Sequence, residues 1–168
     1  MKSSSTEPSD QHSHHQALMK FALEAAEVGY WELDPVTGQF LFNSDRALAM
    51  LGLPPGTPLT HEKALACLHP DDRPHVDAAI AAARGEPFHV DVRVPQPDGS
   101  IRWLTSSAGL LLAPTGKRIV GLVRDITARK RAEAALRESE TRLRLAMDAS
   151  AASTWLWDAQ TNQSYWDD

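Results

Sequence analysis

The sequence predicts an α+β domain built on an antiparallel sheet. Two short strand patterns lie in the first quarter of the chain, three longer ones follow after its midpoint, and helical patterns flank both groups. Strands and helices grouped in this way are typical of α+β domains, whereas regular alternation would indicate a parallel sheet. Gly and Pro residues between the last three strands predict short antiparallel connections.

The chain is expected to start with a tail, a helix and a hairpin. Residues 1–16 are polar, with almost nothing apolar to bury, so we expect them to be a disordered tail. From Ala17, apolar residues recur at i, i+3 and i+4 spacing, which predicts an amphipathic helix that ends at Gly29. A strand follows from Tyr30 to Leu33. Asp34 to Gly38 has strong turn chemistry and predicts that the next residues return as the second strand.

Short helices and three strands complete this domain, which we place at residues 17–127. Helical turns are expected from about 44 to 51 and from 62 to 68, with Thr60 as the cap of the second, and residues 69–74 introduce a third helix that ends at Arg84-Gly85. Phe88 to Val94 alternates apolar and polar residues, as a half-buried strand does. Asp98-Gly99 and Pro114-Thr115-Gly116 then turn the chain into two further strands, and the last of them ends at Ile126.

The end of the chain repeats its beginning. Trp155-Leu156-Trp157-Asp158 echoes Trp31-Glu32-Leu33-Asp34, and Thr161-Asn162-Gln163 echoes Thr37-Gly38-Gln39 at the same offset. A repeat of this length suits tandem domains rather than a solenoid. We therefore expect residues 150–168 to be the truncated start of a second copy, joined to the first by a helix over residues 128–149.

Composition excludes several classes of function. The net charge of −5 gives no electrostatic footprint for nucleic acid. No apolar run approaches the roughly 20 residues of a membrane-spanning helix, and the N-terminus lacks the apolar segment of a signal peptide. The single cysteine, Cys67, excludes an internal disulfide and favours a reducing compartment. We expect a cytoplasmic protein without a membrane segment.

In this order the motifs resemble the PAS domain, in the variant found in tandem in bacterial sensor kinases. The matching pieces are Trp31-Glu32-Leu33-Asp34, Leu68-His69-Pro70-Asp71-Asp72-Arg73, Asp98-Gly99-Ser100-Ile101-Arg102-Trp103, and Asp125-Ile126-Thr127 before a basic helix. Residues from about 87 to 139 are similar to the segment called the PAC motif. The resemblance implies a five-stranded antiparallel sheet with short helices on one face and a long C-terminal linker helix.

The resemblance also implies a sensory role. The chain has no phosphate-binding Gly loop, no catalytic Ser/His/Asp set in a plausible context, no paired cysteines for zinc and no kinase or cyclase signature. We therefore expect a sensory input module without catalytic residues, from the N-terminal part of a sensor histidine kinase, with the kinase as the downstream partner. The alternatives are the input module of a diguanylate cyclase or phosphodiesterase, and a free-standing dimerisation or partner-binding protein.

Alternation and the pocket geometry of the family together predict which residues face the interior. They are Trp31, Leu33, Val92, Val94, Leu104, Ser106, Gly121 and Val123. Only Ser106 is polar, whereas a cofactor pocket needs several converging polar groups. We therefore expect an interior filled by its own side chains or by an unknown small apolar ligand, with no metal, and neither flavin nor haem.

Signal should leave the domain through Asp125-Ile126-Thr127, with Thr127 capping the outgoing helix and Asp125 tethering the strand end to it. In a heptad frame, that helix places Leu136, Leu143 and Ser150 at one core position and Ala132, Ser139 and Ala146 at the other. Leucines against small residues make a poor coiled coil, which predicts a weak parallel homodimer. The alternative is that the apolar stripe packs on its own domain.

Other polar residues have both a functional and a structural interpretation. Cys67 could react with a flavin as in LOV photoreceptors, but their Asn-Cys-Arg-Phe-type signature is absent here, so we expect a small buried residue. His69 could ligate haem, as histidines do in some haem-binding PAS proteins, yet its position before a helix favours a structural role. Asp71 and Asp72 are explained as helix cap and dipole partners. The remaining candidates, His61 and His75, are expected at the surface.

Overall fold

The structure is a computed structural model that describes residues 8–82, 87–114, 116–150, 155–158 and 160–166 of the 168-residue chain. The chain divides into two compact units, one ending at Thr127 and one beginning at Ala128. Each unit is described separately below. No helix in the described part of the chain is both long enough and apolar enough to cross a membrane.

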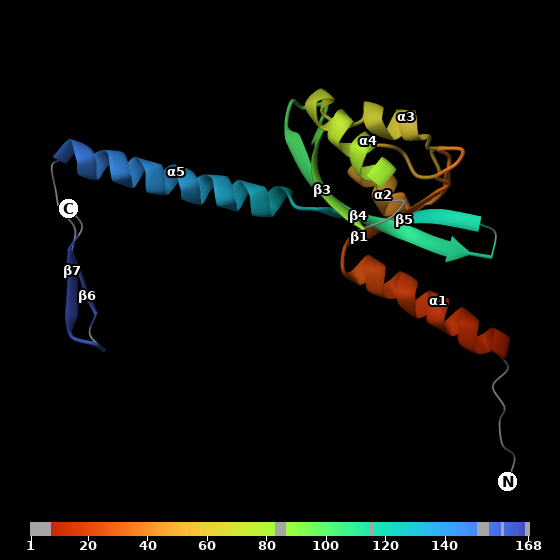
Figure 1. Cartoon of the computed structure of the whole chain (residues 1–168), viewed down its shortest axis with the longest axis horizontal. Helices are drawn as coiled ribbons and strands as arrows, with labels where there is room; N and C mark the ends of the chain where they lie inside the picture. Colours follow the sequence, from red (N-terminus) through yellow and green to blue (C-terminus); the bar gives the residue numbers. More distant parts are fainter. Residues whose placement is uncertain (1–7, 83–86, 115, 151–154, 159, 167–168) are drawn as a thin grey trace, which may run out of the picture. The chain divides into compact units, whose positions relative to one another are not determined.

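The first unit is built on five antiparallel strands, as expected. These are β1 (Val28–Leu33), β2 (Phe40–Asn43), β3 (Phe88–Pro95), β4 (Ile101–Ala113) and β5 (Gly116–Asp125). Their order in the sheet is β2-β1-β5-β4-β3, so the N-terminal hairpin and the later meander meet at the pairing of β1 with β5 (Figure 1). The sheet therefore joins residues at opposite ends of the domain sequence.

Short helices cover one face of this sheet (Figure 1). They are α2 (Asp45–Met50), α3 (His61–Ala66), the 3₁₀ turn η1 (Pro70–Asp72) and α4 (Arg73–Ala82). Ser44 Oγ accepts the Ala47 N–H at 3.2 Å, and Thr60 Oγ1 accepts the Lys63 N–H at 3.2 Å. These bonds satisfy amide groups that the first helical turn leaves open, which explains why α2 and α3 begin where they do.

The first helix begins earlier than expected. Helix α1 spans Pro8–Ala25, so the expectation of a disordered tail is wrong for residues 8–16, while residues 1–7 lie outside the described residues. Proline is favoured in the first helical turn because it has no N–H to leave unpaired, and extending an existing helix is much easier than nucleating one. The polar composition of residues 8–16 gave no indication of the helix start at Pro8 or of the extension of the helix.

The buried core lies on the helix-covered face. Leu104, Val94 and Leu33 are exposed by 2 % or less. Helix α2 packs closely against β1 because Gly29 has no side chain: a Cβ there would lie 2.9 Å from the backbone of Ala47. The missing side chain at Gly29 therefore sets how close α2 lies to the sheet.

The second unit consists of a long helix and a hairpin. Helix α5 spans Thr127–Ser150, which confirms the expected long C-terminal helix, and β6 (Trp155–Asp158) pairs with β7 (Gln163–Trp166). Trp157 faces Ser164 as Leu33 faces Phe40 in the first hairpin, at equivalent positions of the sequence repeat. The equivalent turn residues Gly38 and Asn162 also share a positive φ, of 69° and 56°. That these residues start a second domain stays a prediction.

Candidate functional site

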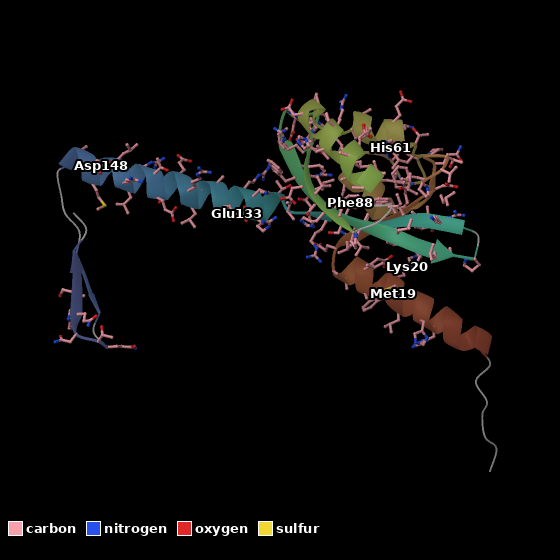
Figure 2. All side chains as sticks on the ribbon, viewed as in Figure 1. Met19, Lys20, His61, Phe88, Glu133 and Asp148 are labelled. Atoms are coloured by element: carbon pink, nitrogen blue, oxygen red, sulfur yellow. The ribbon has the colours of Figure 1, made fainter. Side chains whose placement is uncertain are left out.

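An apolar cavity of about 100 Å³ lies between the inner face of the sheet and the short helices. His61 of α3 and Phe88 of β3 line it from the helical side and from the sheet (Figure 2). The full lining is Trp31, Phe40, Asn43, Ala47, Leu51, Leu59, His61, Ala64, Leu65, Leu68, Val76, Ile80, Phe88, Val90, Val92, Leu104, Ser106 and Val123. The site is therefore a hydrophobic chamber with very few polar groups.

Five of the eight interior residues expected from the sequence lie around this cavity. They are Trp31, Val92, Leu104, Ser106 and Val123. Leu33 and Val94 are instead packed in the core, exposed by 2 % and 1 %. Gly121 lies under the indole of Trp31, because a Cβ on Gly121 would be only 2.2 Å from that ring. Whether any of them contacts a ligand stays a prediction.

Two polar residues of the lining were not expected from the sequence. Asn43 Oδ1 is buried and has no hydrogen-bond partner among the described residues. Asn43 and Phe40 both line the cavity, which strict alternation along a strand forbids. The cause is a shift of register in the β1–β2 pair, where Leu33 faces Phe40 but Glu32 faces Phe42. A bulge of this kind gives no reliable sequence signal.

The second residue, His61, was expected at the surface but is half-buried at the cavity. Its Nε2 lies 2.6 Å from Asp77 Oδ1 of α4, so the pair connects the two helices that cover the chamber. A partner sixteen residues further along the chain cannot be read from helical periodicity. The pair is therefore a tertiary feature of the site.

The cavity, at about 100 Å³, is small compared with known ligand sites. Sites for drug-sized ligands measure roughly 300–1,000 Å³, and an apolar cavity of about 150 Å³ already holds benzene. Neither Cys67 nor His69 lines the chamber. The Cys67 thiol donates to Lys63 O at 3.3 Å, and burial raises its pKa, which opposes formation of a reactive thiolate. Cys67 was expected to be buried, and it is only partly buried.

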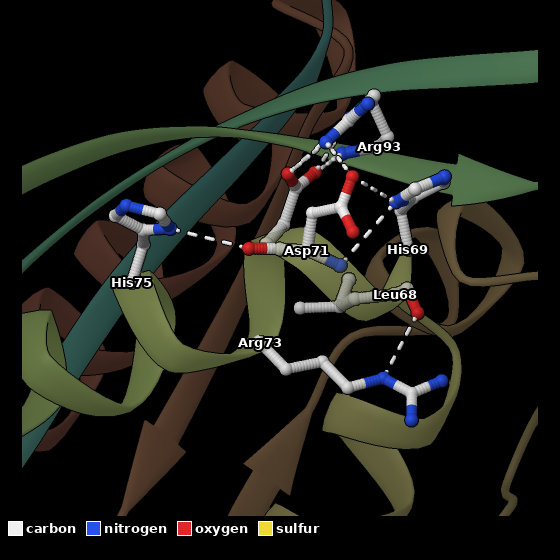
Figure 3. Close-up of polar contacts among 7 residues, drawn as sticks. Leu68, His69, Asp71, Arg73, His75 and Arg93 are labelled. Atoms are coloured by element: carbon white, nitrogen blue, oxygen red, sulfur yellow. Dashed lines mark hydrogen bonds and ion pairs between the residues drawn. The ribbon is translucent and has the colours of Figure 1, made fainter.

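Residues at the η1 turn bond the short helices over the cavity to the edge of the sheet (Figure 3). His69 N–H donates to Arg93 O of β3 at 2.8 Å, and Arg93 N–H donates to Asp72 Oδ2 at 2.7 Å. The Arg93 guanidinium reaches Asp72 Oδ1 at 2.6 Å, and these bonds hold the pKa of Asp72 below its usual value. Arg93 also lies over the Trp103 ring, 5.9 Å from its centre. Asp72 therefore pairs with the edge strand of the sheet.

His69 and Asp71 also have structural roles at this turn (Figure 3). His69 Nδ1 accepts the Asp71 N–H at 3.4 Å, while His75 Nδ1 lies 3.2 Å from Asp71 O. Arg73 donates to Leu68 O at 3.2 Å, which ties the start of α4 to the preceding turn. Among the described residues, no group of three potential metal ligands comes together.

The junction to α5 is a compact set of bonds in which Asp125 tethers the strand end to the helix start, as expected, whereas the Thr127 side chain does not cap the helix. Asp125 Oδ1 accepts the Thr127 N–H at 2.8 Å, so Asp125 caps the helix start. Thr127 Oγ1 accepts the Trp103 N–H at 2.9 Å, so Thr127 is the residue that ties the helix to the sheet. Ile126 N–H also donates to Trp103 O at 2.9 Å. The bond from Thr127 to β4 comes from tertiary structure, which is why sequence spacing assigned the role of Thr127 wrongly.

Arg102 connects the same junction to α2. Its Nη1 donates to Ala49 O at 2.8 Å and to Met50 O at 3.0 Å, at the end of that helix. Its Nε lies 3.6 Å from Asp125 Oδ2. Since α2 contributes Ala47 to the cavity wall, a single side chain links that wall to the residue that caps α5.

Comparison with known proteins identifies the family of this domain. A family model described as the PAS fold matches residues 40–123, half of the chain. The chain belongs to the PAS family. The resemblance inferred from the motifs is thereby confirmed, as is the PAS fold.

Relatives of this PAS domain occur in sensor proteins. The chain is 35 % identical to the sensor protein FixL of Bradyrhizobium diazoefficiens, over 82 % of this chain and 27 % of that protein. It is 30 % identical to a blue-light-activated histidine kinase of Brucella anthropi, over 69 % and 24 %. The crystal structure of a sensory box histidine kinase/response regulator from Burkholderia thailandensis superposes with a TM-score of 0.60 and 32 % identity, over 75 % of this chain and 97 % of that one. The chain spans about a quarter of the length of the first two proteins.

Proposed function

We propose that this PAS domain is the cytoplasmic input module of a bacterial sensor histidine kinase. The observation that carries the proposal is a small cavity whose walls are bonded to the start of the outgoing helix. Histidine kinases among the relatives support the assignment of the output. The alternatives are a diguanylate cyclase or phosphodiesterase output and a free-standing partner-binding protein. To test them, this domain is joined to each class of output domain, and the dependence of the output activity on the signal is measured.

The ligand that fits this cavity is a small, mostly apolar molecule with one hydrogen-bond donor. The volume of about 100 Å³ admits only a few non-hydrogen atoms. Asn43 Oδ1 is the acceptor that such a donor would satisfy, because it is buried without a partner among the described residues. An unpaired buried polar atom costs free energy, so a ligand that supplies the donor gains affinity over one that does not.

Two connections carry a change at the cavity to α5. One runs from α2 through Arg102 to Asp125, and the other from the η1 turn through Arg93 and Trp103 to Thr127. A ligand shifts the population of two arrangements only as far as it binds one of them more tightly. The bonds of Arg102 and Arg93 would differ between the two arrangements of the short helices, and this difference would alter the cap of α5.

Matched probes test the ligand assignment. Pyrrole and furan have nearly the same size, but only pyrrole carries an N–H donor. We expect pyrrole to bind about two- to tenfold more tightly than furan, as one net hydrogen bond provides. Ligand-observed NMR of Asn43→Leu should show no preference, while Gln39→Leu, an exposed amide in the same hairpin, should retain it. Equal binding of both probes to the unmodified chain would exclude Asn43 as the anchor.

Amide hydrogen exchange tests the connection to the helix. Saturation with pyrrole should change exchange at residues 127–131 in the unmodified chain. Arg102→Gln should reduce this change, because it removes the link between α2 and Asp125. If exchange at the start of α5 responds equally in both proteins, Arg102 plays no part in transmission.

The second unit completes the proposal. We assign residues 128–149 to a signalling helix that forms a weak parallel dimer and residues 150–168 to the start of a second PAS domain. The shared hairpin register and the shared positive φ at Gly38 and Asn162 support this assignment. In α5, Leu136 and Leu143 are each 62 % exposed, so both are available for packing against a partner helix.

A further inference from the structure

A second, polar cleft of about 380 Å³ lies at the junction end of the first unit. It is bounded by the end of α1, the end of α2, the start of β4 and the end of β5. The lining residues are Ala26, Glu27, Arg46, Ala49, Met50, Arg102, Arg124 and Asp125. None of them lines the apolar cavity, so the two spaces are separate.

Three guanidinium groups face two carboxylates in this cleft. Arg102 is held in place by the carbonyl oxygens at the end of α2. Arg46 and Arg124 are exposed, and neither guanidinium group has a hydrogen bond or ion pair with another described residue. Two cations without partners beside a third, immobilised one form a concave positive surface, which concentrates anions from solution.

The three arginines outnumber the two carboxylates of the cleft, Glu27 and Asp125. Asp125 Oδ1 is occupied by the Thr127 N–H, and its Oδ2 lies beside Arg102. Glu27 has a φ of 56°, in the left-handed region that residues with a Cβ adopt only at a cost. Glu27 follows the end of α1, and its N–H donates to Glu24 O at 3.1 Å, so this conformation belongs to the end of the helix.

We propose that this cleft binds a small diphosphate, with Arg46 and Arg124 as direct phosphate ligands in the same cleft as Arg102. Arginine forms paired N–H···O bonds with phosphate oxygens. Two guanidinium groups without partners can therefore bind two phosphoryl groups. The volume lies within the range of small-molecule sites. Asp125 both lines the cleft and caps α5, so this site is a second input that acts directly at the junction.

Titration calorimetry with inorganic pyrophosphate on the full 168-residue chain tests the site. At low ionic strength, Arg46→Gln and Arg124→Gln should each weaken binding by about tenfold or more, because each loses a charge-assisted bidentate contact. Lys117→Gln is the matched control: Lys117 is an exposed cation at the opposite end of β5 and outside the cleft. It removes the same charge and should change the affinity by less than about twofold. All three residues are exposed, so unliganded stability should remain unchanged.

Three results would overturn the proposal. The first is no heat of binding at millimolar pyrophosphate. The second is equal weakening by Lys117→Gln, since that outcome means attraction to net charge rather than a site. The third is citrate binding as tightly as pyrophosphate, which would exclude phosphoryl recognition. The apolar cavity and its ligand are unaffected by any of these results, so the two proposals fail independently.

Discussion

At the scale of single residues, the contact between Trp31 and Gly121 shapes the cavity. The two residues face each other across β1 and β5, and the indole lies where a side chain on Gly121 would stand. Trp31 also lines the cavity and packs edge-on against Phe40. The absence of a side chain at position 121 therefore allows Trp31 to act as a wall of the chamber.

Gly121→Ala should destabilise the domain because the new Cβ would be 2.2 Å from the Trp31 ring. Overpacking of this kind costs about 1–3 kcal/mol of unfolding free energy, measured by urea denaturation. Gly109→Ala on β4 is the control, since a Cβ there meets only Pro87, at 3.7 Å. Equal stability of the two variants would show that Trp31 moves aside freely.

The Asp72–Arg93 pair should make stability depend on pH. Arg93 holds the folded-state pKa of Asp72 below the ordinary value of 3.8. A depressed carboxyl pKa contributes stability above the unfolded-state value, and this contribution is lost as the pH falls through the folded-state value. Asp72→Asn should cost about 1 kcal/mol at neutral pH, given solvent screening, and progressively less in acid.

Urea unfolding at a series of pH values measures this effect. The stability curves of the unmodified chain and Asp72→Asn should converge below the ordinary pKa of Asp72. Arg93→Gln should flatten the same part of the curve, because Asp72 would then titrate near its ordinary pKa. If the stability curves of the unmodified chain and Asp72→Asn run parallel at all pH values, the pKa of Asp72 does not differ between the folded and unfolded states.

At the scale of elements, the η1 turn and the α5 junction both act on the sheet. The turn bonds to the free edge of β3 through His69 and Asp72, which protects that edge from pairing with another chain. The junction bonds to β4 through Trp103. Since Arg93 of β3 lies over Trp103, the two attachments are neighbours across one strand pair.

Thr127→Val should loosen the start of α5 without disrupting the sheet. It removes the hydroxyl that accepts the Trp103 N–H and leaves that half-buried donor unpaired, at a cost of about 1–2 kcal/mol. Amide exchange at residues 128–131 should become faster. Thr127→Ser, which keeps the hydroxyl, should behave like the unmodified chain. Equal protection in Thr127→Val would assign the attachment to Asp125 and Ile126 alone.

At the scale of the whole molecule, α5 is the longest helix in the described part of the chain. Its 24 residues span about 36 Å. The i, i+4 pairs Arg129–Glu133 and Arg142–Glu138 are surface contacts that support the helix by a few tenths of a kcal/mol each. A seam made from leucines and small residues adds little more, so its pairing can change at low cost.

Leu136→Glu and Leu143→Glu should each shift the proposed dimer toward monomer in sedimentation velocity runs at high micromolar concentration, because like charges would meet at the seam. Leu145→Glu is the matched control: Leu145 is equally exposed, at 63 %, but lies off the heptad seam. Identical sedimentation of all three variants and the unmodified chain would contradict a dimer through α5.

The order of elements and the caps of α2 and α3 could be predicted because they depend on local chemistry. Strand alternation from Phe88 to Val94, the turn at Asp98-Gly99 and the Ser44 and Thr60 caps all appear where the residues indicated. The start of α1 was misplaced because low apolar content does not prevent a helix from extending over a few polar residues.

The sequence by itself determined the fold class, the family and part of the set of inward-facing strand residues, because side-chain periodicity is a local property of the backbone. Only the tertiary structure decided which polar atoms meet the cavity and the junction. Asn43 reaches the chamber through a register shift, His61 through Asp77, and Thr127 through the backbone of Trp103. Each of these contacts joins residues from separate elements, and their geometry exists only once the sheet and the helices have packed together.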